Sequence, residues 1–294
     1  MPPFQKHQRL FRDAKTAQGT FPARTLLEDI ARAYALGREH PIVDPTLGRG
    51  SRTRGVDPDR VHDLTGLSRD CAGSRNLVWA AFYCGLIHQQ PPFFPATWHC
   101  IVQQQLTKAL VRLPKSDIER ILDAHQPFGL SRPEWKMNLS GAFAVARAGA
   151  ALNEIGGRVY LPHLSEDVRG KIDLIYQFPT LERGLCLQLK SDAGADETTH
   201  QVVDEAAASA DPEGYFERFL AGVRILGRYN PGIAWIPVLL TVGQRPYLDQ
   251  AVVSGCPPIF RGVHAMHTEL RGPPSEALPP ESAAPPSETQ EPTP

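Results

Sequence analysis

The chain of 294 residues lacks the features that would place it in a membrane or in a secretory pathway. It has no uninterrupted run of about eighteen apolar residues, which is the length that a membrane-spanning helix needs. The first residues, MPPFQKHQRLFRDAK, are basic and contain no apolar segment of the kind found in signal peptides. We therefore expect a cytoplasmic protein with no membrane partner.

Paired cysteines are also missing. The five cysteines are scattered along the chain without a Cys-x-x-Cys pair, which argues against a disulfide framework and predicts reduced thiols. No internal repeat is present. With 41% hydrophobic residues, the chain can bury one large core or two modest ones.

Charge is unevenly distributed, although the net charge is only -1. Residues 1–112 carry 15 Lys and Arg against 9 Asp and Glu, whereas residues 113–294 carry 16 against 23. We expect a polyanion to meet the first half of the chain. From Pro273 onward, eight prolines and a single large apolar residue, Leu278, predict a disordered acidic tail.

The second half has the pattern of an α/β protein. The Ala-rich segment from Met137 to Ile155 has no proline and ends at two glycines, which predicts a helix. The segments that follow predict three strands, two helices and a last strand, at 158–162, 172–178, 185–191, 199–210, 213–229 and 232–243.

Three polar residues interrupt the apolar strands of this pattern. In LCLQLKS, residues 185–191, the three leucines share one face of the strand, so Gln188 and Lys190 share the other. Asp173 lies on the neighbouring strand and, counted back from the turn, comes opposite the far end of this strand. We therefore expect the side chains of Asp173, Gln188 and Lys190 to meet at one edge of the sheet.

These residue types suit metal-assisted hydrolysis of a phosphodiester. Mg²⁺ prefers oxygen ligands, which Asp173 supplies as a carboxylate and Gln188 as a neutral amide oxygen. Lys190 can hold the attacking water and stabilise negative charge on the scissile phosphate. An amide and an ammonium buried without partners would each cost on the order of 1 to 3 kcal/mol, so packing alone does not favour them. The alternative is a hairpin in which an Asp and a Lys occur by chance.

The arrangement of Asp173 ahead of Gln188-Leu-Lys190 across a hairpin resembles the PD-(D/E)XK nuclease superfamily, in the variant with Gln at the last acidic position. The resemblance covers roughly 135–243 and implies a restriction-endonuclease-like αβββαβ core, dependence on Mg²⁺ with Mn²⁺ as a substitute, and cleavage of DNA or less often RNA. Asp173 matches the metal-binding aspartate, Gln188 the variable position and Lys190 the motif lysine. Ile172 stands where the family motif has proline.

A glutamate on the preceding helix, which many members of this family carry, is missing from the expected face. That face holds only alanines and a valine. Glu154, at the end of the helix, is the nearest acid, and we take it as the third catalytic and metal-binding candidate. Its alternative is a solvated glutamate in the last turn, and Glu166 and Asp167 are weaker candidates.

The first half contains a segment that resembles the helix-turn-helix of winged-helix regulators. It consists of a helix over 25–37, a short helix after Asp57, a turn at Thr65-Gly66 and a longer helix from about 70 to 84. The resemblance and a basic loop at 47–55 imply DNA contacts from Arg52, Arg54, Arg69, Ser74, Arg75 and Asn76. The alternative is an ordinary three-helix packing domain.

Together these patterns predict four regions: a basic N-terminal segment (1–18), a helical and DNA-binding region (19–112), a nuclease domain (113–270) and the tail (271–294). The expected activity is metal-dependent cleavage of double-stranded DNA, in a restriction or genome-defence role. Cleavage of both strands would favour a homodimer. The alternatives are a DNA-binding regulator with a catalytically inactive nuclease-like domain, and an RNA-processing enzyme.

Overall fold

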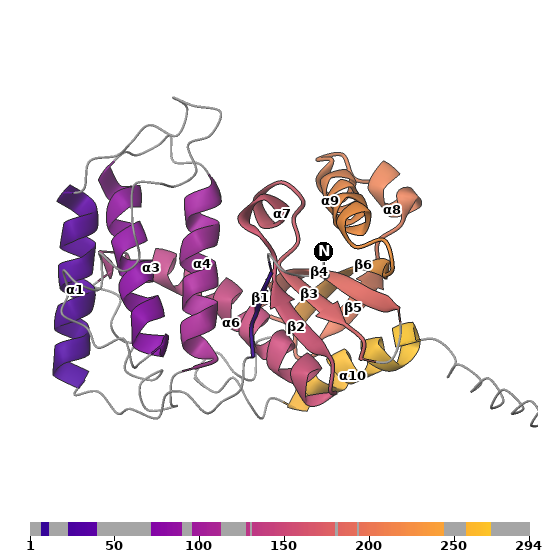
Figure 1. The fold of residues 1–294 in the computed structure, drawn as a ribbon, viewed down its shortest axis with the longest axis horizontal. Helices are drawn as coiled ribbons and strands as arrows, with labels where there is room; N and C mark the ends of the chain where they lie inside the picture. The colour runs from indigo at the N-terminus through magenta and orange to yellow at the C-terminus, as the bar shows by residue number, and fades with distance from the viewer. Residues whose placement is uncertain are drawn as a thin grey trace, which may run out of the picture.

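The structure is a computed structural model that describes residues 7–11, 23–39, 72–89, 96–112, 128–129, 131–179, 182–192, 194–243 and 257–271. Three helices, α1 (Ala23–Glu39), α3 (Ala72–Gln89) and α4 (Ala96–Leu110), lie side by side at one end of the molecule (Figure 1). A sheet with helices on both faces forms the other end. We call these two parts the helical half and the sheet half.

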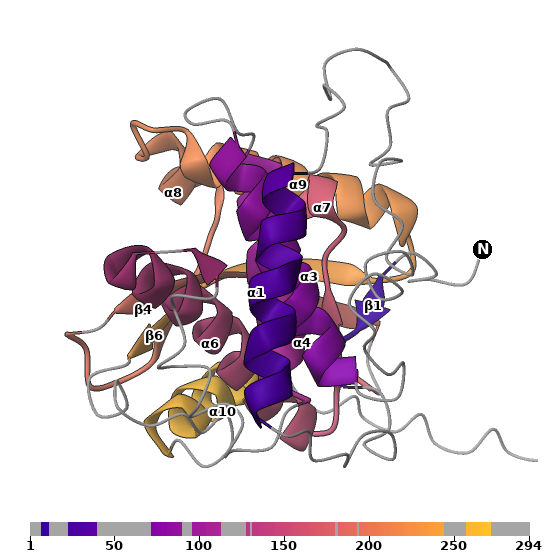
Figure 2. The ribbon, with the colours of Figure 1, turned by 90° about the vertical axis from the view of Figure 1, so that its left-hand side faces the viewer.

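Helix α3 is the centre of the helical half. Its residues from 76 to 86 are buried except for Trp79, because it lies between α1 and α4 (Figure 1). In the turned view, α1 lies in front of it (Figure 2). Glycines permit the close approach of α1: a Cβ atom at Gly37 would lie 2.1 Å from the backbone oxygen of Phe82, and one at Gly85 would lie 2.2 Å from that of Tyr34. The expected helix over 25–37 corresponds to α1, and the expected helix over 70–84 corresponds to α3, which continues to Gln89.

Helix α6 (Arg132–Glu154) connects the two halves. Trp135 and Leu139, near its beginning, belong to the hydrophobic core of the helical half. Ala151 and Leu152, near its end, belong to a core beneath the sheet. The region that we expected to begin at 113 therefore supplies part of the helical core as well.

The sheet has six strands among the described residues, in the order β1-β2-β3-β4-β6-β5. They are β1 (Gln8–Arg9), β2 (Arg158–Leu161), β3 (Leu174–Gln177), β4 (Arg183–Asp192), β5 (Thr199–Val202) and β6 (Ala234–Gly243). β4 and β6 are parallel and the other pairs are antiparallel. A parallel pair needs a crossover, which here contains α8 (Glu205–Ser209) and α9 (Tyr215–Tyr229). The mixed α/β class that the sequence predicts is confirmed.

Each face of the sheet has its own apolar core. Leu187 of β4 packs with α6 and with Met266 of α10 (Pro257–Arg271) on one face. Cys186 packs with Phe219 and Leu226 of α9 on the other face (Figure 1). The predicted alternation of β4 is therefore present, with the leucines on the α6 side.

Two parts of the sheet differ from expectation. Thr199–Val202 forms an edge strand against β6 instead of a helix, as its β-branched ends favour. The helix begins only after Asp204, whose side chain accepts a hydrogen bond from the Ala207 N–H at 2.8 Å. At the opposite edge, β1 pairs with β2 and places Leu10 in the core beneath the sheet.

Several predicted segments lie outside the described residues. These are the basic loop at 47–55, the short helix after Asp57 and the tail from 272 onward. Within the described part of the chain, no helix combines the length and the apolar character needed to cross a membrane.

Candidate active site

The β3–β4 hairpin places Asp173 opposite Gln188. Leu174 pairs with Leu187 in the antiparallel register, and the Asp173 N–H donates to the Leu187 carbonyl at 2.8 Å. β4 is buried from 184 to 189 and becomes exposed from Lys190 onward. The polar residues Gln188 and Lys190 therefore lie where β4 changes from buried to exposed.

Asp173 and Gln188 are in direct contact. Oδ2 of Asp173 accepts hydrogen bonds from Gln188 Nε2 at 2.6 Å and from the Leu189 N–H at 2.7 Å. Gln188 Nε2 also donates to the Leu189 carbonyl at 3.3 Å. Both bonds of the Gln188 side chain use its amide nitrogen, so they leave the amide oxygen out of the contact with Asp173.

That oxygen, Gln188 Oε1, is a buried acceptor without a hydrogen-bond partner among the residues that the structure describes. The residue as a whole is only 6% exposed. Leaving such an acceptor unsatisfied costs about 1 to 3 kcal/mol, which a leucine at this position would avoid. Packing in the apolar strand does not explain the amide, so a bound group that uses the oxygen is the better explanation.

Lys190 lies on the same face of β4 as Gln188 and contacts the first turn of α9. Its Nζ lies 4.4 Å from the centre of the Tyr215 ring, within the range of a cation–π interaction. The lysine is exposed. α9 therefore fixes the direction of the ammonium group without removing it from solvent.

The loop between α7 (Leu164–Val168) and β3 forms a second wall of the site. Gly170 and Gly222 of α9 touch through their backbones, since a Cβ atom at Gly222 would lie 2.5 Å from the Gly170 Cα. Lys171 has a φ of 53°, a left-handed conformation that is uncommon for lysine. The Ile172 N–H donates to the Glu166 carbonyl at 3.2 Å, which folds the loop back on itself. This fold brings Asp167, one residue past Glu166, toward the hairpin.

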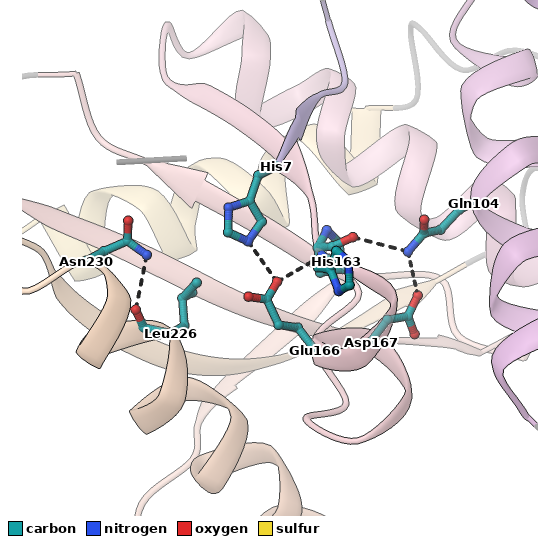
Figure 3. A network of polar contacts seen from close by, with 8 residues as sticks. His7, Gln104, His163, Glu166, Asp167, Leu226 and Asn230 are labelled. Atoms are coloured by element: carbon teal, nitrogen blue, oxygen red, sulfur yellow. Dashed lines mark hydrogen bonds and ion pairs between the residues drawn. The ribbon is translucent and has the colours of Figure 1, made fainter. Parts of the chain in front are cut away.

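Asp167 is held from the helical half. Gln104 of α4 donates from Nε2 to Asp167 Oδ2 at 2.9 Å and to the Pro162 carbonyl at 3.4 Å (Figure 3). The Cys100 thiol, one turn earlier on α4, also forms a hydrogen bond with Asp167. Burial, followed by the charge of Asp167, strongly raises the pKa of the Cys100 thiol, so this cysteine is a neutral donor. α4 thus orients an acid that belongs to the sheet half.

The neighbouring Glu166 holds the N-terminal strand in place. Its Oε2 lies 2.8 Å from His7 Nε2 and accepts the His163 N–H at 2.9 Å (Figure 3). Glu166 is therefore engaged in structural contacts on the side of α7 that faces β1. Asp167, and not Glu166, is the acid of this helix that contributes to the site.

Electrostatics in the site are dominated by the two aspartates. Burial, followed by the charge of Asp167, raises the pKa of Asp173 to about 8, although the Leu189 N–H, Lys190 and Lys171 oppose the rise. Burial also raises the pKa of Asp167, against its hydrogen bonds to α4 and the Lys171 charge. Burial disfavours the ionised form of both aspartates. A bound cation would stabilise the ionised forms, so the pair favours cation binding.

The donor set fits a hard divalent cation. It consists of two carboxylates and the unpartnered amide oxygen of Gln188, which is the kind of set that Mg²⁺ uses together with water. Both hydrogen bonds to Asp173 end on Oδ2, and within the described residues Oδ1 accepts none. No cluster of three or more His, Cys, Asp or Glu side chains suited to a metal occurs in the described part of the chain. Oxygen donors of this kind suit magnesium or manganese better than zinc.

Glu154 does not join this group. It is exposed at the end of α6, a few residues before Arg158, which pairs with Gln177. Asp173 precedes β3, whereas Gln177 ends it. The register therefore places Glu154 near the end of β3 that is opposite to Asp173. The structure therefore contradicts the choice of Glu154 as the third metal ligand. The end of α6 lies beside the end of β3 that is far from Asp173.

Two of the residues that we expected to contact DNA, Arg75 and Asn76, are less exposed than predicted. Asn76 is 6% exposed and bonds to α4, so the expectation that it faces outward is wrong. Arg75 is half-buried, and Ser74 lies in the first turn of α3. The remaining three arginines, Arg52, Arg54 and Arg69, lie outside the described residues.

Three further site residues escaped the sequence analysis. Lys171 follows a glycine in the loop just before Asp173, and this short spacing could have indicated it. Tyr215 begins a predicted helix, but nothing in the pattern indicates that it contacts Lys190. Gln104 lies 63 residues from its partner Asp167, and no local signal points to the contact.

Comparison with known proteins assigns no family to this arrangement. No protein-family model, no curated protein and no solved structure matches the chain.

Proposed function

We propose that this protein is a metal-dependent DNA endonuclease whose site is formed by Asp167, Asp173, Gln188 and Lys190. The observation that carries the proposal is the buried, unpartnered Gln188 Oε1 beside an aspartate of raised pKa. Support also comes from the order of elements around the hairpin, which is α6, β2, β3 and β4, then α8 and α9, then β6 parallel to β4, with the short helix α7 and the edge strand β5 as additions. This order agrees with the αβββαβ core that the resemblance to PD-(D/E)XK nucleases implies.

Each residue has a distinct role in this proposal. Asp167, Asp173 and the Gln188 oxygen would hold the cation, which when bound supplies Lewis-acid stabilisation of phosphoryl oxygens. Lys190 is exposed and directed by Tyr215, so its ammonium can hold the attacking water and stabilise charge on the scissile phosphate. Gln104 acts from α4 by orienting Asp167. A restriction or genome-defence role would use this activity on double-stranded DNA.

One observation favours a second function. Glu154, which we expected to complete the metal site, lies near the opposite ends of the strands. Without Glu154, the site has one fewer acid than we predicted. A DNA-binding regulator with an inactive nuclease-like domain is consistent with that loss. Asp167 compensates for it in our proposal, and cleavage separates the two functions.

The test measures conversion of supercoiled plasmid to nicked and linear forms after purification in EDTA. We expect cleavage with Mg²⁺ or Mn²⁺, none with EDTA, and none from Asp173→Asn in either condition. Asp192→Asn is the matched control, because Asp192 is an exposed aspartate at the end of the same strand. A labelled RNA duplex in parallel reactions tests the RNA-processing alternative.

Each outcome has a clear interpretation. Cleavage by Asp173→Asn at the wild-type rate removes the site assignment. Duplex binding in EDTA without cleavage in either metal supports the regulator instead. Because Asp173→Asn removes a carboxyl group that burial disfavours, we expect the variant to be folded, and thermal unfolding verifies that its inactivity is chemical.

A further inference from the structure

The loop between α7 and β3 contains a lysine in an unfavourable backbone conformation. Among the described residues, Lys171 is the one residue other than glycine with a positive φ, at 53°. This conformation crowds the Cβ atom, so glycine or asparagine is the usual occupant of such a position. The backbone at 171 therefore favours a residue other than lysine.

Contacts on both sides of Lys171 fix this conformation. The Ile172 N–H donates to the Glu166 carbonyl at 3.2 Å, which closes the turn that follows α7. On the other side, a Cβ atom at Gly222 of α9 would lie 2.5 Å from the Gly170 Cα, so the two backbones touch. α7 and α9 lie on the same side of the sheet (Figure 1). The neighbours of Lys171 in the chain are therefore held in place, and the lysine keeps its left-handed backbone.

The side chain of Lys171 is half-buried and acts on both acids of the candidate site. Burial raises the pKa of Asp173 and of Asp167, and the Lys171 charge opposes the rise in each. Within the described part of the chain, the ammonium forms no ion pair or hydrogen bond with either carboxylate. The ammonium is thus close enough to influence both acids, and its N–H groups are available to a ligand.

Two ammonium groups from different elements therefore act on Asp173. Lys190 comes from β4 and contacts Tyr215, whereas Lys171 comes from the α7 loop. A divalent cation in the site would balance the two carboxylates, and it would repel an ammonium that served only as their counter-ion. A phosphate bound to the cation restores negative charge and gives the ammonium a partner. The position of Lys171 is thus better suited to a site that contains a phosphate than to one that contains the metal alone.

We propose that Lys171 is a second catalytic cation, whose ammonium contacts a non-bridging oxygen of the scissile phosphate. The inference rests on the proposed nuclease function. In that reaction the oxygen of a water molecule bonds to phosphorus, and the bond from phosphorus to the leaving sugar oxygen breaks, with its electron pair going to that oxygen. The attacking water releases a proton to solvent, and the leaving oxygen takes one from solvent. Lys171 stabilises the negative charge on the phosphoryl oxygens in the transition state.

The rate of plasmid cleavage over a series of Mg²⁺ concentrations separates a catalytic cation from a counter-ion. Lys171→Gly and Lys171→Asn remove the charge and tolerate the left-handed backbone, so their melting temperatures should equal or exceed that of the wild type. We expect both variants to cleave about tenfold or more slowly, even where more Mg²⁺ no longer raises the rate. Lys171→Arg keeps the charge and should retain most of the rate. Arg169→Ala is the control, because Arg169 is an exposed cation in the same loop.

Three results would overturn the inference. If the two uncharged variants need less Mg²⁺ but reach the wild-type rate at saturation, Lys171 is only a counter-ion, and the nuclease function stands. If Lys171→Arg is as slow as Lys171→Gly, the positive charge is not what the reaction uses. If the folded wild type cleaves DNA with neither Mg²⁺ nor Mn²⁺, the nuclease function fails, and the role of Lys171 fails with it. Should one uncharged variant not fold, the other decides, because each relieves the backbone with a different side chain.

Discussion

The two halves of the molecule bury charges of opposite sign. In the sheet half, Asp167 acts electrostatically on Asp173, which bonds to Gln188, and the Gln188 Oε1 atom has no partner among the described residues. In the helical half, Lys108 is mostly buried, and Arg112 donates to Asn76, which donates to Gln105. Both groups lie in otherwise apolar surroundings, where neutral residues would pack at lower cost. The comparison teaches that the two halves differ in what their polar groups leave open: among the described residues, the Gln188 oxygen has no partner, whereas Asn76 is bonded through both its oxygen and its nitrogen.

The halves also differ in how their polar groups are assembled. The contacts of Asn76 with Gln105 and Arg112 join α3 to α4 and to the residues just after it, and the two helices pack directly. The acidic site combines a hairpin, the α7 loop, the start of α9 and one side chain from α4. A site with more contributing elements should be more sensitive to the packing around it. The following predictions test this comparison.

Loss of Lys190 should have the largest effect. We expect Lys190→Ala to reduce the rate of plasmid cleavage by about 100-fold or more, because a charge directed at the reacting phosphate stabilises the transition state. DNA affinity in EDTA should change little, since one exposed cation adds little to a binding site of many phosphates. Arg228→Ala, an exposed cation at the far end of α9, is the control. Full activity in Lys190→Ala would remove its catalytic role.

The contact between α9 and the α7 loop should be the most sensitive packing site of the sheet half. A Cβ atom at Gly222 would lie 2.5 Å from the Gly170 Cα, so Gly222→Ala should reduce the free energy of unfolding by about 1 to 3 kcal/mol. At Gly227 on the same helix, the nearest atom would lie 3.7 Å away, in Trp235. Gly227→Ala should therefore be neutral or stabilising by about 0.5 to 1 kcal/mol. Urea denaturation of both variants measures the contrast, and equal effects would show that the contact is not tight.

Gln188 tests whether the unpartnered oxygen binds the cation. Gln188→Leu keeps the size of the side chain but removes the oxygen, so Mg²⁺ affinity should fall about tenfold or more with little loss of stability. Gln188→Glu adds a negative charge beside Asp173 and should tighten Mg²⁺ or Mn²⁺ binding. Calorimetric titration of metal into the three proteins measures the order. If all three bind alike, Gln188 is not a ligand.

Lys108 should give the smallest effect, and a pH-dependent one. Its pKa is about 8 in the fold, below its ordinary value of 10.5, so the folded protein holds the charged form only at a cost. Below pH 8 both folded and unfolded chains carry the proton, and the full cost is present. Between pH 8 and 10.5 the unfolded chain binds more protons, and the stability of the wild type rises with pH relative to a variant without this group.

Lys108→Met should accordingly unfold at a higher free energy than the wild type at neutral pH, by on the order of 1 kcal/mol. The difference should shrink as the pH rises toward 10, and denaturant curves at several pH values measure it. Lys190→Met is the control, because its exposed side chain has no burial cost to remove. A difference that is constant with pH would mean that Lys108 is not charged at a cost in the fold.

Short-range patterns predicted the hairpin and its polar face. The alternation of β4 correctly separated the leucines from Gln188 and Lys190, and the turn correctly placed Asp173 opposite Gln188. The choice of Glu154 failed because spacing along a helix does not tell which end of the next strand the chain will reach. We expected Asn76 to face solvent because its neighbours in the chain suggest the start of a helix. In the structure, α4 covers its side chain.

By itself, the sequence determined the α/β class, the boundaries of most strands and the face on which Gln188 and Lys190 lie. These features follow from side-chain alternation and turn residues, which act over a few positions along the chain. Only the tertiary structure decided that Asp167, and not Glu154, lies near Asp173, that Tyr215 contacts Lys190, and that Lys108 is buried. The physical reason is that these contacts depend on how whole helices pack, and packing is set by surfaces that lie far apart in the sequence.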